Sequence, residues 1–532
     1  MRKLLSVLIA AVFVLSAFAV AEVSKDDYTP FEEPVVIACL RADGFEGYNL
    51  GDPDWVSPED NKWITTIRDY LNVEFDNTWL LTGDSAQSTS TQWDLAIANG
   101  ILPMCGTVNA KQYEELLEAG LLVDMSDLYE EYASETVHEL CDDSPEMAYM
   151  TRGGKLYGLP VVSPSYGNYD MLHIRKDWMD EVGATEYPTT IEELVELGQE
   201  FVDAGLGKYI LVLGTQAGTN MGSNWGTIQG WMTGYGVAWK SNCWILDEES
   251  GEVIYGATDK KVADALLGLQ ELYTAGLIRE DYISTPANES FNAGEAGLIY
   301  GINYGAVQTV DLYALDTEGK VEIVGVDAPT LDGEKPEYWD AAVPSSFFVV
   351  TTAANEEQQQ AIMLAYDLTQ RLFADFDYDW GYRRSASPLC AQCESAWQRV
   401  IYYADIEYAY NTGDTTKFNT ANAKTYYDRI VAFEAGDRSL GKYEAIYRVP
   451  DGTYGVMYRA MLDGRMNNTV YVAPPTETMN EKRGLLDTLL LDAANKVIMG
   501  ADIQVWYDAV EEWYTNGGQT MTDEVNAWYS AQ

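Results

Sequence analysis

Short apolar runs alternate with segments of helical periodicity along the chain, and this alternation limits the folds available to it. In the first part, strands are expected at residues 35–40, 73–75 and 101–104, and helices at residues 63–71 and 112–117. Strands that alternate with helices along a sequence favour an open α/β domain with a mostly parallel sheet.

The same alternation continues beyond residue 160. Thr189 and Glu192 have the spacing of a capping box, which predicts a helix over 191–201 with its apolar stripe facing inward. Further helices are expected at residues 261–275 and 356–370, and strands at residues 297–301, 321–326 and 347–351; the chain after about residue 385 is mainly helical and aromatic. A chain of 532 residues is long enough for two domains, so we expect it to cross between two lobes twice, near residues 161–166 and 327–343.

The charge balance argues against several classes of partner. The chain carries 33 Lys and Arg against 84 Asp and Glu, a formal net charge of −51. Such a surface repels nucleic acid, anionic lipid and polyanionic ligands, but it accepts a neutral ligand. A hydrophobic content of 47% and an aromatic content of 12% are typical of a fully globular protein, which we expect to be a monomer.

The N-terminus has the pattern of a cleavable export signal. Arg2 and Lys3 precede the apolar run 4–20, and Ala19 and Ala21 offer a small-x-small cleavage site, so residues 1–21 are predicted to be a signal peptide. A membrane anchor is the alternative, but the run is shorter than the ~20 residues that a spanning helix requires. We therefore expect an extracytoplasmic protein.

Cysteine and histidine do not form a recognisable metal or redox site in the sequence. Cys390 and Cys393 have the C-x-x-C spacing, yet no thioredoxin-like strand pattern precedes them, so a local disulfide and two free thiols both remain open. The histidines, His138 and His173, are expected at the surface or at an interface, because neither belongs to a cluster with zinc-like spacing. No metal is expected.

Catalytic signatures are also missing from the sequence. With 84 acidic residues, carboxylate pairs occur everywhere, and their spacing cannot select a glycosidase pair. The chain contains no nucleophile elbow, phosphate-binding loop or metalloprotease motif. The sequence therefore favours a binding function over an enzymatic one.

Two segments of the chain together resemble a known family. Residues 153–160 read Gly-Gly-Lys-Leu-Tyr-Gly-Leu-Pro and are followed by Ile-Arg-Lys-Asp-Trp at 174–178 and Pro-Thr-Thr-Ile-Glu-Glu-Leu at 188–194. Residues 511–529 contain Glu-Glu-Trp, then Gly-Gly, then Glu-Val-Asn-Ala-Trp-Tyr, in the manner of a closing helix pair. Their order and spacing resemble the family 1, oligosaccharide-type extracellular solute-binding proteins of ABC transporters, which are maltose-binding-like, and within them the lipoprotein LipO-like subgroup.

This resemblance implies a two-lobed α/β periplasmic-binding-protein fold of type II, with two or more crossings and a helical C-terminal extension. The N-terminal lobe would span residues 32–163 and 340–384, and the C-terminal lobe residues 164–328 and 385–532. The implied function is capture of a neutral oligosaccharide by hinge closure and its delivery to a membrane permease, without a cofactor and without bond cleavage. A secreted carbohydrate-active enzyme and a binding protein for another solute, such as a peptide, are the alternatives.

The chain departs from the family pattern in two places. Relatives in Gram-positive bacteria carry a lipidated cysteine directly after the leader, whereas the first cysteine here is Cys39. Many relatives also carry a calcium loop after the helix that corresponds to 191–201. The equivalent stretch 202–209 contains a single acid, Asp203, against the roughly six oxygens that calcium requires, so no calcium is expected there.

Candidate ligand contacts are aromatic, amide and hydroxyl side chains in glycine-rich loops, because sugar rings stack on aromatic faces while their hydroxyls need polar partners. By this criterion and by the family resemblance, the candidates are Trp63, Ser163, Tyr166, Asn224, Trp225, Trp231, Tyr304, Arg383 and Arg384. Trp225 lies at the end of the amide-rich loop 214–225, away from any apolar stripe, so little core packing is expected of it. Core packing of Trp63 and a charge-balancing role for the two arginines stay open as alternatives.

Overall fold

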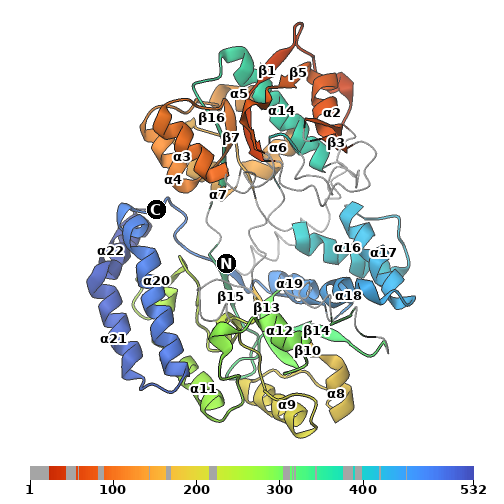
Figure 1. Ribbon diagram of the computed structural model, residues 1–532, viewed down its shortest axis with the longest axis vertical. Helices are drawn as coiled ribbons and strands as arrows, with labels where there is room; N and C mark the ends of the chain where they lie inside the picture. The colour runs from red at the N-terminus through yellow and green to blue at the C-terminus, as the bar shows by residue number, and fades with distance from the viewer. Residues whose placement is uncertain are drawn as a thin grey trace.

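The computed structural model of the chain describes residues 23–42, 55–57, 59–81, 89–142, 144–162, 169–214, 225–303, 312–313, 316, 319–341, 344, 346–374, 387–389, 393, 398–418, 421–450 and 452–531. These residues form two lobes, each around its own hydrophobic core (Figure 1). The mixed α/β, two-lobed class that the sequence implies is therefore confirmed.

The chain passes between the two cores three times. The first core draws on buried residues between 23 and 162 and between 347 and 393, and the second on residues between 169 and 338 and between 400 and 525. Leu389 and Cys393 pack in the first core, whereas the expected range 385–532 assigned them to the second lobe; Tyr338, which lies between the expected ranges, packs in the second core. The expected ranges implied a third passage near residue 384, and in the cores it follows Cys393.

The first lobe is built on a four-stranded sheet in the order β16, β7, β2, β6. β2 (Cys39–Ala42) runs parallel to β6 (Leu80–Leu81) and β7 (Cys105–Asn109), and β16 (Ser346–Val350) runs antiparallel to β7. A separate parallel pair joins β1 (Val35–Ile37) to β5 (Val73–Phe75), so the single strand expected over 35–40 is two strands with different partners. The helices of this lobe are α2 (Lys62–Leu71), α3 (Thr89–Asn99), α4 (Ala110–Glu118), α5 (Ser126–Tyr132), α6 (Glu135–Cys141), α7 (Pro145–Met150) and α14 (Glu356–Ala374), and its short hairpins pair β3 (Trp55–Ser57) with β4 (Asp60–Asn61) and β8 (Thr151–Arg152) with β9 (Lys155–Leu156).

One predicted strand of this lobe is wrong. Residues 101–104 lie outside the sheet, and the strand begins only at Cys105. Ile101 is 67% exposed, and Pro103 has no amide hydrogen to donate to a neighbouring strand. Residues 101–104 therefore belong to the connection between α3 and β7 rather than to the strand.

The second lobe is built around β10 (Asp170–Arg175), which pairs antiparallel with β13 (Leu298–Ile302) on one side and with β14 (Ile323–Val326) on the other. The mostly parallel pairing expected from the sequence is thus found in the first lobe. In the second lobe, β10 pairs antiparallel with both of its neighbours. The remaining elements of this part are α8 (Lys176–Val182), α9 (Ile191–Asp203), α10 (Gln229–Gly234), β11 (Trp244–Leu246), β12 (Val253–Tyr255), α11 (Val262–Thr274), α12 (Ala287–Asn292) and β15 (Tyr338–Asp340).

The start of α9 shows how local sequence sets an element. Thr190 is the N-cap, its hydroxyl accepts from the Glu193 amide, and the Glu193 carboxylate accepts from the amides of Thr189 and Thr190. The predicted helix is confirmed, and its capping box lies one residue later than expected. The box satisfies amides that the first turn of a helix leaves without partners.

The chain after the third crossing is helical. It consists of α16 (Gln398–Thr412), α17 (Ala421–Glu434), α18 (Gly441–Tyr447), α19 (Thr453–Leu462), α20 (Glu477–Ile498), α21 (Gln504–Trp513) and α22 (Gln519–Ser530), with β17 (Met466–Asn468) parallel to β15. In Figure 1, α20, α21 and α22 lie side by side along one flank of the second lobe. Gly517 has a φ of 136° where α21 turns into α22, so the expected closing helix pair is present and is bent at its glycine pair. Among the described helices, none is both long and apolar enough to cross a membrane.

Candidate functional site

One edge of the second lobe's sheet lies next to the first crossing. β10 begins at Asp170, directly after the segment that enters this lobe, and its antiparallel partners end at the same edge. Asp170 pairs with Ile302 in the register, and Leu172 pairs with Val326. Polar residues at the start of β10 and at the ends of β13 and β14 are therefore brought to the side of the lobe where the chain arrives from the first lobe.

Asn303 is the most informative residue at this edge. It follows β13 directly, is 0% exposed, and its carbonyl oxygen accepts a hydrogen bond of 2.6 Å from the Thr453 hydroxyl of α19. Among the described residues, neither polar atom of its side-chain amide has a hydrogen-bond partner. Such a buried group costs roughly 1–3 kcal/mol, and a polar ligand at this edge would offset that cost.

Asn303 is not among the residues predicted from the sequence, although the adjacent Tyr304 is. The signal that could have found it is its position, because a polar residue that directly follows a fully buried strand lies at the edge of a sheet. Asp170 lies at the same edge as the first residue of the neighbouring strand β10 and is 1% exposed. Both residues belong to the edge described above.

Trp225 is placed otherwise than the sequence suggested. It is 3% exposed, and its ring lies edge-on to His173 at 4.7 Å and to Phe291 at 5.7 Å between ring centroids. It also bridges to Gly301 of β13. The expectation that little core packing depends on Trp225 is wrong, because pairing with β13 draws the end of its loop into the lobe.

Two other candidate tryptophans are buried in the same manner. Trp231 of α10 is 1% exposed, and its indole nitrogen donates a 2.9 Å hydrogen bond to the carbonyl oxygen of Ala265. Trp63 of α2 is 2% exposed and packs on Phe373, with 4.8 Å between ring centroids. In this structure neither ring offers a face on which a ligand could stack, and the open alternative of core packing for Trp63 is the one observed.

The remaining candidates lie outside the described residues. They are Ser163, Tyr166, Asn224, Tyr304, Arg383 and Arg384. Their positions in the sequence border elements that the structure does describe: the first crossing, the residue before Trp225, the residue after Asn303 and the chain after α14. Their roles in ligand binding stay predictions.

His173 lies in the interior rather than at a surface or an interface, which corrects the expectation for this residue. It occupies the middle of β10, is 0% exposed, and one ring nitrogen lies 3.3 Å from the carbonyl oxygen of Gly301. Burial lowers the pKa of His173 to about 4, so the ring is neutral at physiological pH. The other histidine, His138, is partly exposed on α6 and contacts Asp142.

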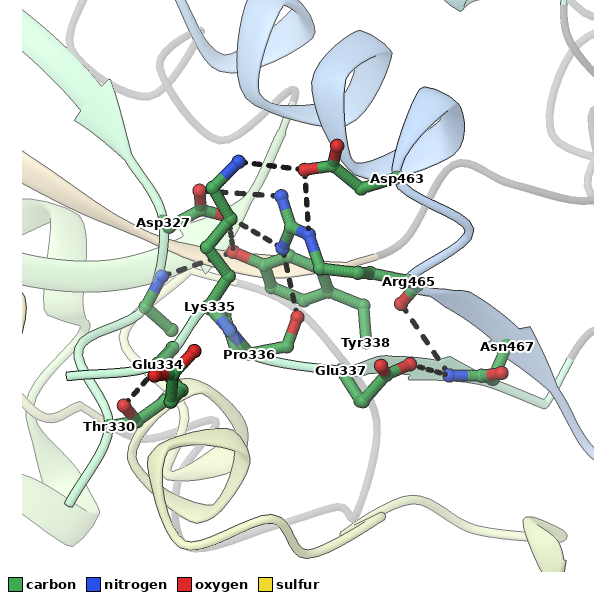
Figure 2. Close-up of polar contacts among 11 residues, drawn as sticks. Asp327, Thr330, Glu334, Lys335, Pro336, Glu337, Tyr338, Asp463, Arg465 and Asn467 are labelled. Carbon is green, nitrogen blue, oxygen red and sulfur yellow. Dashed lines mark hydrogen bonds and ion pairs between the residues drawn. The ribbon is translucent and has the colours of Figure 1, made fainter. Parts of the chain in front are cut away.

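The segment that leads to the return crossing is held firmly in the second lobe by a polar network around Arg465 (Figure 2). The Arg465 guanidinium donates to Asp327 at 3.1 Å and to the carbonyl oxygen of Pro336 at 2.9 Å. Tyr338 donates to the same Asp327 carboxylate at 2.9 Å and accepts from the amide of Ala328 at 3.0 Å. Figure 2 shows Arg465, the residue before β17, lying over the ring of Tyr338 in β15, so this contact links the two strands of the small sheet.

The last residue of β15 makes a second anchor. Asp340 forms an ion pair with Lys240, and the side chains are only 5% and 8% exposed. Truncation of one partner of such a buried pair would leave the other charge without compensation. The return crossing therefore starts from a residue that is anchored in the second lobe.

Metal chemistry has no support in the described part of the chain. No group of three or more His, Cys, Asp or Glu side chains there could hold an ion.

In the first lobe, the carboxyl ends of β2 and β7 lie at one edge, the position where open α/β sheets bind ligands. Asn109 at the end of β7 caps α4, and its side-chain oxygen accepts a hydrogen bond from the Gln112 amide at 3.0 Å. Helix α4 therefore begins at this edge of the sheet.

Comparison with known proteins agrees with this architecture. Residues 71–368, more than half of the chain, match the family profile described as bacterial extracellular solute-binding protein. The chain belongs to this family. The resemblance drawn from residues 153–194 and 511–529 is thereby confirmed, and the family is one of extracellular binding proteins rather than enzymes.

Solved structures of similar fold are also solute-binding proteins. FusA of S. pneumoniae, an ABC-transporter substrate-binding protein in complex with kestose, has a TM-score of 0.61 at 13% identity, covering 93% of this chain and 99% of that one. An HMO-binding solute-binding protein of Bifidobacterium longum infantis has a TM-score of 0.58 at 12% identity, covering 94% and 99%. The alginate-binding protein AlgQ2, crystallised without calcium, has a TM-score of 0.55 at 14% identity, covering 94% and 99%. At these identities the likeness shows the fold alone, and among curated proteins no sequence match is found.

Proposed function

We propose that this solute-binding protein captures a neutral oligosaccharide where its two lobes meet and delivers it to an ABC-transporter permease in the membrane. The family match carries the binding function, and the sugars named for solved structures of the same fold, kestose and alginate among them, support an oligosaccharide as the ligand. Hinge closure is the mechanism, because contacts that a ligand makes only in the closed form stabilise that form.

A neutral ligand is favoured by the charge of the protein. The formal net charge of −51 disfavours the approach of anions, and this repulsion is strongest at low salt. Hydroxyl groups carry no such penalty and need only fixed donors and acceptors. A sugar without carboxylate or sulfate groups meets both conditions.

Asn303 is the described residue that we propose as a ligand contact. Its buried amide offers one acceptor and two donors, which is the combination that a pair of sugar hydroxyls requires. Ser163, Tyr166, Asn224, Tyr304, Arg383 and Arg384 are proposed as further contacts from their places in the sequence. Trp63, Trp225 and Trp231 already pack against side chains or bond to backbone within their lobes, which argues against stacking on a ligand.

Export is proposed to use residues 1–21 as a cleaved leader. The basic start, the apolar run and the small residues before Glu22 support this assignment. N-terminal sequencing of the secreted protein tests it. A mature protein that begins near Glu22 is expected, and an intact Met1 on the exported protein would contradict it.

The test of function is a thermal-shift screen of the chain from residue 22 onward against neutral oligosaccharides, an oligouronate and a peptide mixture. At least one neutral glycan is expected to raise the melting temperature, and mass spectrometry is expected to recover it intact. A shift produced only by peptides would overturn the sugar assignment, and cleavage of the glycan would show an enzyme.

Asn303→Leu sharpens this test, because leucine has a similar volume and no polar atoms. Affinity for the best glycan is expected to fall about tenfold, ~1.4 kcal/mol. The melting temperature without ligand is expected to stay the same or to rise, because leucine removes a buried amide that has no described partner. Asn99→Leu is the matched control, since Asn99 is exposed at the end of α3 in the other lobe. Unchanged affinity in Asn303→Leu would remove this residue from the site.

A further inference from the structure

Two buried cysteines from distant parts of the chain meet in the first lobe. The Sγ atoms of Cys141 and Cys393 lie 3.5 Å apart, although 252 positions separate the residues in sequence. Cys141 ends α6 and is 0% exposed, and Cys393 is 5% exposed. A disulfide bond has a sulfur–sulfur distance of about 2.05 Å, so a small rotation of the side chains would bring the two sulfurs into bonding range.

The surroundings hold both sulfurs in place. The Tyr366 hydroxyl lies 3.2 Å from the Cys393 sulfur and 3.6 Å from the Cys141 sulfur, and it donates to the Pro160 carbonyl oxygen at 2.7 Å. The backbone amide of Cys393 donates to the Gln370 side chain at 2.9 Å. Both tyrosine and glutamine come from α14, so this helix positions Cys393 against α6.

We propose that Cys141 and Cys393 form a disulfide bond in the exported protein, and that this bond ties the third crossing to the first lobe. Cys393 is the last described residue of the first core before the chain enters α16 in the second lobe. The bond would therefore fix the first-lobe end of a hinge segment. The extracellular location of the family provides the oxidising compartment that such a bond requires.

The chemistry is a two-step exchange with a disulfide oxidant, such as oxidised glutathione or a disulfide oxidoreductase. The Cys393 thiolate attacks one sulfur of the oxidant and releases the other as a thiolate, which leaves a mixed disulfide on Cys393. The Cys141 thiol then loses its proton and attacks the Cys393 sulfur, which releases the second thiolate. Two protons and two electrons leave the protein, and the oxidant is reduced to two thiols.

Cys393 is the better attacking group of the two. Burial alone would raise the pKa of Cys393, but the hydrogen bond from the Cys141 thiol and the contact with the Tyr366 hydroxyl lower it, which favours the thiolate. Because both sulfurs are buried in the folded lobe, we place the exchange during folding, while the site is still open to the oxidant.

Cys393 also belongs to the C-x-x-C sequence with Cys390, and this is the competing pairing. Cys390 lies outside the described residues, whereas the contact between Cys141 and Cys393 is observed directly. A pair that encloses 252 positions constrains the unfolded chain far more than a pair three residues apart. The two pairings therefore predict different linked peptides and different effects of reduction on stability.

The experiment is disulfide mapping of the chain from residue 22 onward, refolded with oxidised glutathione, alkylated in denaturant and digested without reductant. A linked peptide that contains Cys141 and Cys393 is expected in the unaltered protein and in Cys390→Ser. It is expected to be absent from Cys141→Ser. A linked Cys390–Cys393 peptide, or alkylation of both Cys141 and Cys393, would overturn the proposal.

Thermal unfolding with and without reductant gives a second measurement that does not rely on peptide mapping. Reductant is expected to lower the melting temperature of the oxidised protein by at least about 5 °C, and to leave Cys393→Ser unchanged. Cys243→Ser is the matched control, because Cys243 is a buried thiol whose sulfur contacts the carbonyl oxygen of Asp340, and the sensitivity of this variant to reductant should equal that of the unaltered protein. Equal melting temperatures with and without reductant in the unaltered protein would contradict the bond, even if Cys393→Ser fails to fold.

Discussion

At the scale of single residues, two buried titratable groups shift stability in opposite directions. Burial lowers the pKa of His173 from 6.5 to about 4, so the folded state stays neutral while the unfolded chain binds a proton; stability is lost as the pH falls from about 6.5 to 4. Burial raises the pKa of Glu444 from 4.5 to about 7, even though the Arg448 guanidinium lowers it. The folded state then keeps a proton that the unfolded chain releases, and stability is lost as the pH rises from about 4.5 to 7. Between pH 4.5 and 6.5 the two effects largely cancel.

Glu444→Gln should remove the loss of stability that ionisation of Glu444 causes as the pH rises. The variant is expected to be more stable than the unaltered protein at pH 8, by up to about 3 kcal/mol, because glutamine is neutral at every pH whereas Glu444, with its pKa raised to about 7, must lose a proton in the buried site. At pH 4.5 the gain should be close to zero. Denaturant unfolding across this pH range measures it.

Glu481→Gln is the control for this prediction, since Glu481 is exposed on α20. Its difference from the unaltered protein should stay small at both pH values. A Glu444→Gln gain as large at pH 4.5 as at pH 8 would show that the carboxylate is not held in its protonated form.

At the scale of secondary-structure elements, Trp225 connects a loop to the edge of β13. Trp225→Ala should cost ~3–5 kcal/mol of stability, because the ring packs on His173 and Phe291 and its removal leaves a cavity in the core. The melting temperature of the protein without ligand is the measurement. A variant that melts like the unaltered protein yet binds glycan weakly would return Trp225 to the ligand site.

The bend between α21 and α22 depends on its glycine pair. A Cβ atom at Gly518 would collide with the ring of Trp513, which itself stacks on Tyr255 at 5.2 Å between centroids. Gly518→Ala is therefore expected to cost about 1–3 kcal/mol through overpacking and to speed hydrogen exchange in residues 504–530. Gly484→Ala is the matched control, because no atom lies within 4 Å of a Cβ at this exposed position of α20.

Gly484→Ala should stabilise the protein by roughly 0.5–1 kcal/mol, since alanine has the higher helix propensity. The same substitution is thus expected to stabilise the protein at Gly484 and to destabilise it at Gly518. If Gly518→Ala were as stable as Gly484→Ala, the contact of α21 with the second lobe would not depend on the bend.

At the scale of the whole molecule, the charge of −51 makes ionic strength a diagnostic of the ligand class. Affinity for a neutral glycan should change less than about twofold between 0.01 M and 0.5 M salt, because no long-range charge interaction is screened. An oligouronate should bind poorly and should gain affinity as salt rises, since screening weakens its repulsion. Calorimetric titrations at both salt concentrations measure this. An oligouronate that binds more tightly at low salt would point to a local cationic site, for which Arg383 and Arg384 would be the first substitutions to test.

The sequence by itself determined what depends on neighbouring residues. Strand β5, helix α9 and the closing helix pair follow from apolar periodicity, a capping box and a glycine pair, all of which act within about ten positions. The class of protein followed from short segments in a set order. Even here the single strand expected over 35–40 became β1 and β2, because the choice of pairing partner is not encoded locally.

Only the tertiary structure decided which of the polar and aromatic residues are buried, and where the chain passes between lobes. From the sequence, His173 was expected at a surface or an interface and Trp225 in a loop. Both are buried, because β10 pairs with β13 and the Trp225 ring packs between His173 and Phe291. Asn303 became a candidate because β13 ends beside the first crossing, and Cys141 meets Cys393 across 252 positions because α14 packs beside α6. The physical reason is common to all of them: burial and proximity result from contacts between segments far apart in the chain, and local periodicity contains no information about which segments meet.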